Sequence, residues 1–163
     1  MTTLTLPNPR LGIATGTPNR GVSEVAQDLA DRWLRLFVEQ REPMSQGEGV
    51  RLGELEDIVT ECSEHGWDGY DGEPVDRLSV SEASRFLLAL PANIPAPQVS
   101  VDPDGEVSMD WEGTPDTLFS VSIRGDGRLS YAGRFGIRRA RGTEYLSDEI
   151  PRQVMDHVRR ALS

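Results

Sequence analysis

The spacing of apolar residues changes once along the chain, and this change separates a helical part from a strand part. Up to about residue 90, apolar residues recur every three or four positions, as on one face of a helix. From Pro95 onward they alternate with polar residues, as in strands with one buried face. The pattern therefore predicts an α+β fold.

Four helices are predicted from this pattern. They span about residues 23–39, 51–65, 79–90 and 148–162. Ser23 is an expected N-cap, and Ser79-Val80-Ser81-Glu82 has the sequence of a capping box. Gly66 is the expected stop of the second helix.

Four strands are predicted within about residues 98–133, joined by turns at 102–105, 113–116 and 125–127. Such short connections favour an antiparallel meander. Residues 133–147 are predicted as a Gly- and Arg-rich loop with a short edge strand near 135–137. The expected architecture is a four-stranded antiparallel meander sheet packed against N-terminal helices and a C-terminal helix. Residues 1–20 are expected to form a mobile arm, and 21–163 a single α+β domain.

Size and composition restrict the class of protein. The 163 residues are enough for one domain that buries roughly 70% of the surface of its unfolded chain. Cys62 is the only cysteine, so the chain has no internal disulfide. No apolar run approaches the ~20 residues of a membrane helix, and the N-terminus lacks a signal-peptide pattern. We expect a cytoplasmic protein that does not enter a membrane.

Charge is unevenly distributed. The net charge is −10, yet residues 134–163 hold seven Arg against four acids. Between Arg51 and Arg77 there are nine carboxylates and no Arg or Lys. Such a surface repels nucleic acid and attracts basic proteins. We therefore expect a partner protein with a basic surface and no direct binding of nucleic acid.

The acids of the second helix fall on one side of it. At about 100° per residue, Leu52, Leu55, Ile58, Val59 and Cys62 share one face. Glu54, Asp57, Glu61 and Glu64 lie on the opposite face. Their spacing along the helix, roughly 5 Å, is of the same order as the ~3.4 Å between phosphates of a DNA strand. Mimicry of nucleic acid by an inhibitor is one interpretation, and an ordinary solvated face is the other.

The loop 66–73 follows this helix and offers several alternatives. Trp67 and Tyr70, separated by glycine, are either a structural clasp or anchors for a partner. Asp68, Asp71 and Glu73 carry oxygen ligands suited to a divalent cation, although their spacing is not that of an EF-hand.

Other catalytic chemistry has weak support in the sequence. Cys62 and His65 are spaced for a nucleophilic pair that Asp68 would orient. The alternative is a core cysteine and a cation at the end of a helix. One cysteine and two histidines do not supply the four ligands of a structural zinc site. We predict no catalytic residue, no metal and no cofactor.

Short motifs in residues 50–160 form a recognisable set. They are Gly66-Trp67-Asp68-Gly69-Tyr70, Glu73-Pro74-Val75, Leu90-Pro91, Pro97-Gln98-Val99, Asp110-Trp111, Ser120-Val121-Ser122, Tyr131-Ala132-Gly133 and Gly142-Thr143-Glu144. In this order the chain resembles a group of small bacterial proteins of unassigned function. The resemblance implies a link to mobile-element or defence loci, and it implies no catalytic residue or cofactor.

The sequence as a whole favours a non-enzymatic, acidic protein-binding module that acts as an inhibitor or antitoxin-like regulator. The residues predicted to contact the partner are Glu54, Asp57, Glu61, Glu64, Asp68, Tyr70 and Asp71. One alternative is an enzyme or small-molecule binder that uses the 66–73 loop with a divalent metal. Another is a structural subunit of a larger complex.

Overall fold

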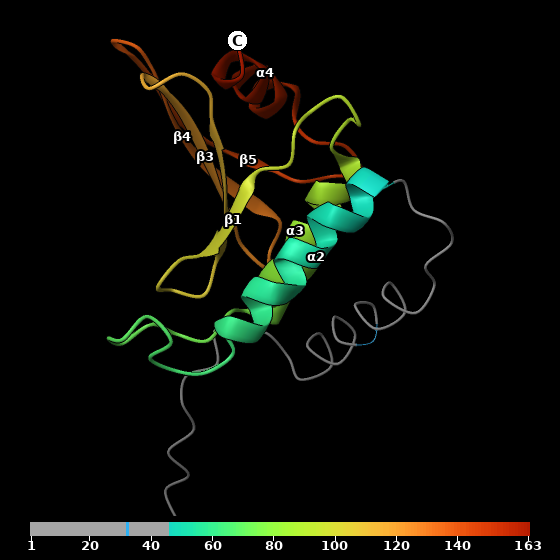
Figure 1. Cartoon of the computed structure of the whole chain (residues 1–163), viewed down its shortest axis with the longest axis vertical. Helices are drawn as coiled ribbons and strands as arrows, with labels where there is room; N and C mark the ends of the chain where they lie inside the picture. The colour runs from blue at the N-terminus through green and yellow to red at the C-terminus, as the bar shows by residue number, and fades with distance from the viewer. Residues whose placement is uncertain (1–31, 33–45) are drawn as a thin grey trace, which may run out of the picture.

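The computed structural model describes residue 32 and residues 46–163 of the chain. Figure 1 shows it with the remaining residues as a grey trace. The predicted arm 1–20 and the helix predicted at 23–39 lie outside the described residues.

The described elements follow the predicted change from helices to strands. Their bounds are α2 Gln46–Glu61, α3 Arg77–Ala89, β1 Gln98–Val101, β2 Val107–Glu112, β3 Thr117–Ile123, β4 Arg128–Phe135, β5 Arg138–Tyr145 and α4 Arg152–Ala161. The α+β prediction is therefore confirmed for residues 46–163.

The strands form one antiparallel meander in the order β1-β2-β3-β4-β5. The predicted number of four strands is wrong, because β5 occupies much of the segment expected to be a loop. Residues 136 and 137, expected within a short edge strand, form the turn between β4 and β5. Gly136 has a φ of 62° there, and a two-residue hairpin turn of type II′ needs glycine at this first position.

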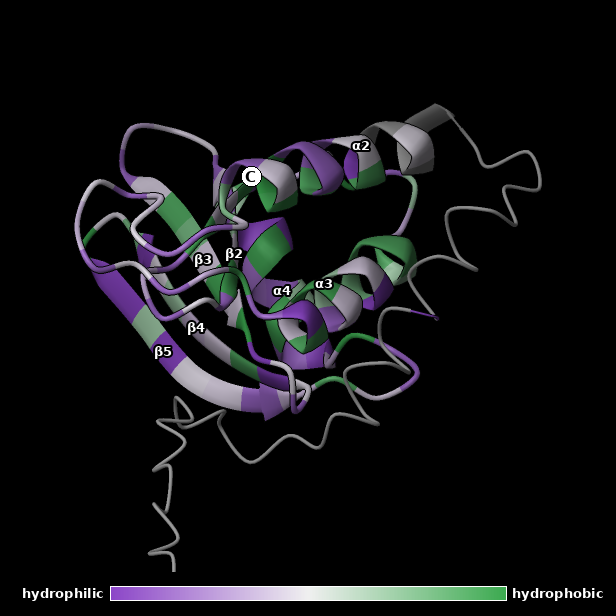
Figure 2. Cartoon of the chain, turned by 90° about the horizontal axis from the view of Figure 1, so that it is seen from below, coloured by the Kyte–Doolittle hydropathy of each residue, from purple (hydrophilic) through white to green (hydrophobic). Residues whose placement is uncertain are grey.

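Helices α2, α3 and α4 cover the same face of the sheet (Figure 2). The core between the two layers is built around aromatic side chains. Phe86 of α3 lies 6.3 Å from Trp111 of β2, and Trp111 lies 6.3 Å from Phe119 of β3, measured between ring centroids. All three rings are buried. Helix α4 packs over β2, β3 and β4, and α2 lies against α3 and β1.

Three predicted helix boundaries differ from the observed ones. Helix α2 begins and ends earlier than 51–65, so Gly66 does not terminate it. Helix α3 begins at Arg77 because Asp76, and not Ser79, is its N-cap: the Asp76 carboxylate accepts the Ser79 backbone N–H at 3.1 Å. Helix α4 begins after Pro151, which holds the N-cap position.

None of the helices in the described part of the chain is long and apolar enough to cross a membrane.

Candidate functional site

The predicted apolar face of α2 is confirmed for Leu52 and Leu55, which are buried, whereas Ile58 and Val59 are half-buried. Cys62 is buried as well, directly after the end of the helix. Glu54, Asp57 and Glu61 are exposed, and their spacing of three and four residues places them on one face of the helix.

The end of α2 changes the geometry of this acidic face. Because the helix ends at Glu61, Glu64 belongs to the exposed segment that follows it. The predicted stripe is thus three carboxylates on the helix and one beyond it. No basic residue lies in the last turn of α2. Glu61 therefore sits at the negative end of the helix dipole without a compensating cation from that turn.

The segment after α2 is tied together by backbone hydrogen bonds. The Gly66 N–H donates to the Gly72 carbonyl at 2.8 Å, and the Val75 N–H donates to the Cys62 carbonyl at 2.9 Å. Gly66 and Gly69 have φ angles of 77° and 81°, which other residues rarely adopt. The glycines of the motif therefore let the chain fold back on itself within a few residues.

Two side chains of the loop hold its shape from inside. An oxygen of Asp68, Oδ1, accepts the backbone N–H groups of Tyr70 at 2.9 Å and of Gly72 at 3.1 Å. The half-buried Trp67 donates its indole N–H to the Glu73 carbonyl at 2.9 Å. These contacts agree with the clasp interpretation of Trp67. They also give Asp68, predicted to contact a partner, an internal structural role.

Tyr70 and Asp71 point away from this framework. The Tyr70 side chain is 85% exposed, and Asp71 is exposed as well. Tyr70 is therefore not part of the clasp, and it is a large exposed aromatic group on the loop that follows the acidic end of α2.

The loop is docked onto the turn between β1 and β2. The Glu73 N–H donates to the Pro103 carbonyl, and the Asp76 N–H donates to the Gly105 carbonyl, both at 2.9 Å. A Cβ on Gly105 would lie 2.7 Å from the Pro74 carbonyl oxygen, so only glycine fits there. The close approach fixes the loop relative to the sheet.

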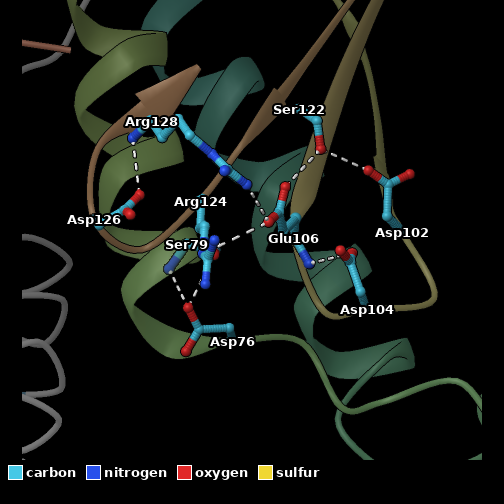
Figure 3. A network of polar contacts seen from close by, with 9 residues as sticks. All are labelled: Asp76, Ser79, Asp102, Asp104, Glu106, Ser122, Arg124, Asp126 and Arg128. Atoms are coloured by element: carbon cyan, nitrogen blue, oxygen red, sulfur yellow. Dashed lines mark hydrogen bonds and ion pairs between the residues drawn. The ribbon is translucent and has the colours of Figure 1, made fainter. Parts of the chain in front are cut away.

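A polar network extends from this turn across the sheet (Figure 3). The Asp102 carboxylate accepts the hydroxyls of Ser108 at 2.6 Å and Ser122 at 2.7 Å. Glu106 pairs with Arg124 at 3.8 Å and Arg128 at 3.5 Å. The sequence indicated a turn at 102–105. The network depends on cross-strand register, which the sequence alone does not reveal.

A groove between α2 and the start of β1 borders the acidic face, and no pattern in the sequence predicts it. Its volume is about 400 Å³. Glu54, Asp57 and Ile58 line one side of it, and residues 96–99 line the other. Two of the predicted partner-binding carboxylates therefore lie beside a concave surface.

The predicted alternative of a Cys62–His65 nucleophile does not fit this environment. Burial, and secondarily the charge of Glu61, raise the pKa of the Cys62 thiol. A reactive cysteine needs the opposite, a lowered pKa and access to solvent. In the part of the chain that the structure describes, no three His, Cys, Asp or Glu side chains gather closely enough to hold a metal ion.

Comparison with known proteins adds no relative: the chain matches no protein-family model, no curated protein and no solved structure. The resemblance to small bacterial proteins remains a hypothesis.

Proposed function

We propose that the chain is a non-enzymatic protein-binding module that holds a basic partner protein and regulates it as an inhibitor or antitoxin does. The proposed contact, called the acidic surface below, consists of Glu54, Asp57, Glu61, Glu64, Tyr70 and Asp71. Asp68 supports it from within the loop. The observation that carries the proposal is the exposure of Tyr70 on a loop whose backbone is held by several hydrogen bonds.

An exposed tyrosine on a fixed loop is suited to anchoring a protein partner. Tyrosine is enriched at the energetic centres of interfaces because its ring buries a large area and its hydroxyl can still hydrogen-bond. A loop already held in one conformation loses little entropy on binding. The hydrogen bonds of Asp68 and Trp67 hold the loop in this conformation in the free protein.

The acids of the proposed contact favour a basic partner. Glu61 lies where the helix dipole makes a negative charge unfavourable, so its position costs stability in the free protein. An Arg or Lys of a partner placed there would compensate both the carboxylate and the dipole. The groove lined by Glu54 and Asp57 offers a further place for a basic side chain.

The test is a charge reversal of the acidic surface. A partner is first captured with the wild-type chain from the organism that encodes it, and is then purified. Replacing Asp57, Glu61 and Glu64 together by Arg should weaken binding about 100-fold, because three attractive contacts of about 1 kcal/mol each are lost. The remaining affinity should no longer fall with added salt.

A matched control separates the site from the overall charge. Asp116, Asp148 and Glu149 are exposed acids outside the acidic surface. Each change of an acid to Arg adds two positive charges, so both triple variants move the net charge from −10 to −4. The control variant should keep wild-type affinity within about threefold. Equal affinities of the two variants would show that the acidic surface is not the contact.

A further inference from the structure

The face of the sheet turned away from the helices carries a second candidate site. Side chains alternate between the two faces of a strand. Phe119 and Tyr131 point into the core, so their neighbours in sequence point outward. The cross-strand register then aligns Leu118, Arg134 and Arg139 in one outward row. Ser120, Ala132 and Arg141 form the adjacent row.

These two rows enclose a shallow hollow of about 570 Å³ over β3, β4 and β5. The hollow lies over Ser120 and Ala132, whose small side chains point outward, and over the backbone of Gly133 and Ala140, whose side-chain positions face the core. The longer side chains of Arg134, Arg139 and Arg141 surround it. We call this feature the arginine hollow. Its volume is in the ~300–1,000 Å³ range of small-molecule sites.

The arginines of the hollow repel one another, which lowers the stability of the fold. Arg134 and Arg139 are directly opposite each other in the β4–β5 register, and like charges in that position are destabilising. The Arg134 guanidinium donates to the Pro115 carbonyl at 3.2 Å. Within residues 46–163, no salt bridge joins any of the three arginines to a carboxylate.

A second pair of arginines, Arg124 and Arg128, differs from the arginines of the hollow because a carboxylate of the same domain balances its charge. Arg124 and Arg128 both lie close to the Glu106 carboxylate, which balances part of their charge (Figure 3). On the rows of the hollow, the corresponding acids are Asp110 and Glu112 of β2. They lie two strands away from Ala132 and Arg134, roughly 9.5 Å across the sheet. The positive charge of the hollow is thus left available to a ligand.

We propose that the arginine hollow binds a small molecule that carries at least two phosphate or carboxylate groups on a compact body. Guanidinium groups bind both kinds of anion through paired hydrogen bonds. Leu118 and Ala132 offer apolar contact to the body of the ligand. Asp110 and Glu112 flank the β2 side and repel a longer polyanion, so the chemistry favours a small ligand over a nucleic-acid strand.

The experiment titrates the whole chain with two probes in separate arms, inorganic pyrophosphate and citrate, and follows backbone amide shifts by NMR. We expect saturable shifts centred on Ser120, Ala132, Gly133 and Ala140. The double variant Arg139→Gln, Arg141→Gln should bind at least tenfold more weakly. Both side chains are exposed, so this variant is expected to keep its fold, and its unfolding midpoint should not fall because the repulsion between Arg134 and Arg139 is removed.

Arg138→Gln is the control, because Arg138 lies on the same strand but points to the other face, opposite Phe135 in register. It should bind both probes as the wild type does. Binding of pyrophosphate alone assigns the hollow to phosphates, and binding of citrate alone assigns it to carboxylates. Shifts that do not saturate, or an equal loss in the Arg138→Gln variant, would overturn the proposal. Neither outcome bears on the acidic surface of α2.

Discussion

Arg51 connects helix α2 to the segment between α3 and β1. It is a buried arginine whose guanidinium donates to the carbonyls of Leu90, Pro91 and Ile94. These three carbonyls belong to the segment that leads from α3 toward β1, so one side chain of α2 fixes the path of the chain between the layers. The sequence shows Arg51 only as the last basic residue before the acidic stretch.

Replacing Arg51 by Ala should lower the free energy of unfolding by about 3 kcal/mol, because buried carbonyls lose charged donors. Urea unfolding measures this loss. Arg152→Ala is the comparison, since the Arg152 side chain is 94% exposed and its contact with Asp156 is on the surface. That variant should change stability by less than about 0.5 kcal/mol. A loss below about 1 kcal/mol for Arg51→Ala would mean that the three hydrogen bonds are not important to stability.

Cys62 links stability to pH in a direction set by its environment. Burial first, and Glu61 second, raise the pKa of the thiol in the folded chain. Above about pH 8.5 the Cys62 thiol loses its proton in the unfolded chain but keeps it in the folded chain. The unfolded state then binds fewer protons, so stability falls as pH rises through that range.

We therefore expect the stability advantage of the wild type over Cys62→Ala to be constant below about pH 8 and to shrink toward pH 10. Urea unfolding of the two proteins at a series of pH values measures it. Alkylation of Cys62 by iodoacetamide should also be much slower in the folded chain than in urea. Rapid alkylation in the folded chain would contradict the burial of Cys62. A stability difference between the two proteins that does not change with pH would contradict the raised pKa of its thiol.

At the scale of elements, β5 shows why part of the fold could not be predicted from the sequence. Its residues lack the alternating apolar pattern that revealed β2 and β3. The inward position at Gly142 needs no apolar side chain, because Tyr131 of β4 covers it: a Cβ there would lie 2.4 Å from the Tyr131 hydroxyl. The apolar side chain that covers this face of β5 comes from β4. The sequence of β5 therefore lacks a strand pattern of its own and is predicted as a loop.

The C-terminal end of α2 allows stability and binding to be separated. Glu61 is unfavourable to the helix dipole, and a cation in its place is favourable by about 0.3–1 kcal/mol. Glu61→Lys should therefore stabilise the free protein while weakening the proposed partner complex. Thermal unfolding and binding to the captured partner measure the two effects. The matched change Glu112→Lys, at an exposed position outside α2, should leave binding unchanged.

A Glu61→Lys variant that is more stable and binds equally well would leave the acidic end of α2 as a solvated face. Lower stability together with weaker binding would show that Glu61 supports the fold and that the dipole argument is wrong for this helix. Only opposite changes in stability and binding agree with the proposed function.

At the scale of the whole molecule, the two candidate sites differ in how far the sequence reveals them. The acids of α2 are close in sequence, so helical periodicity alone brings Glu54, Asp57 and Glu61 together. The arginine hollow is assembled from two strands of a hairpin, and Arg134 meets Arg139 only through the β4–β5 register. With β5 read as a loop, its arginines have no predicted face, and the hollow cannot be anticipated.

The two sites are expected to act independently of each other. Helix α2 lies against β1, whereas the hollow centres on β3, β4 and β5. From β1 to β4 there are three strand spacings, about 14 Å, which exceeds the ~8 Å screening length at physiological salt. Direct interaction between the charges of the two sites is therefore weak, and within residues 46–163 no helix or strand contributes charged residues to both.

The reversal of Asp57, Glu61 and Glu64 should thus change the affinity for pyrophosphate less than twofold at about 0.15 M salt. Likewise, Arg139→Gln, Arg141→Gln should change partner affinity less than twofold. Calorimetric titration of each ligand into the wild type, the two variants and the combined variant gives the coupling free energy between the two sites. We expect this coupling free energy to be near zero. A coupling above about 1 kcal/mol that persists at high salt would mean that the partner reaches across both faces. In that case the acidic surface and the arginine hollow would be parts of one larger interface.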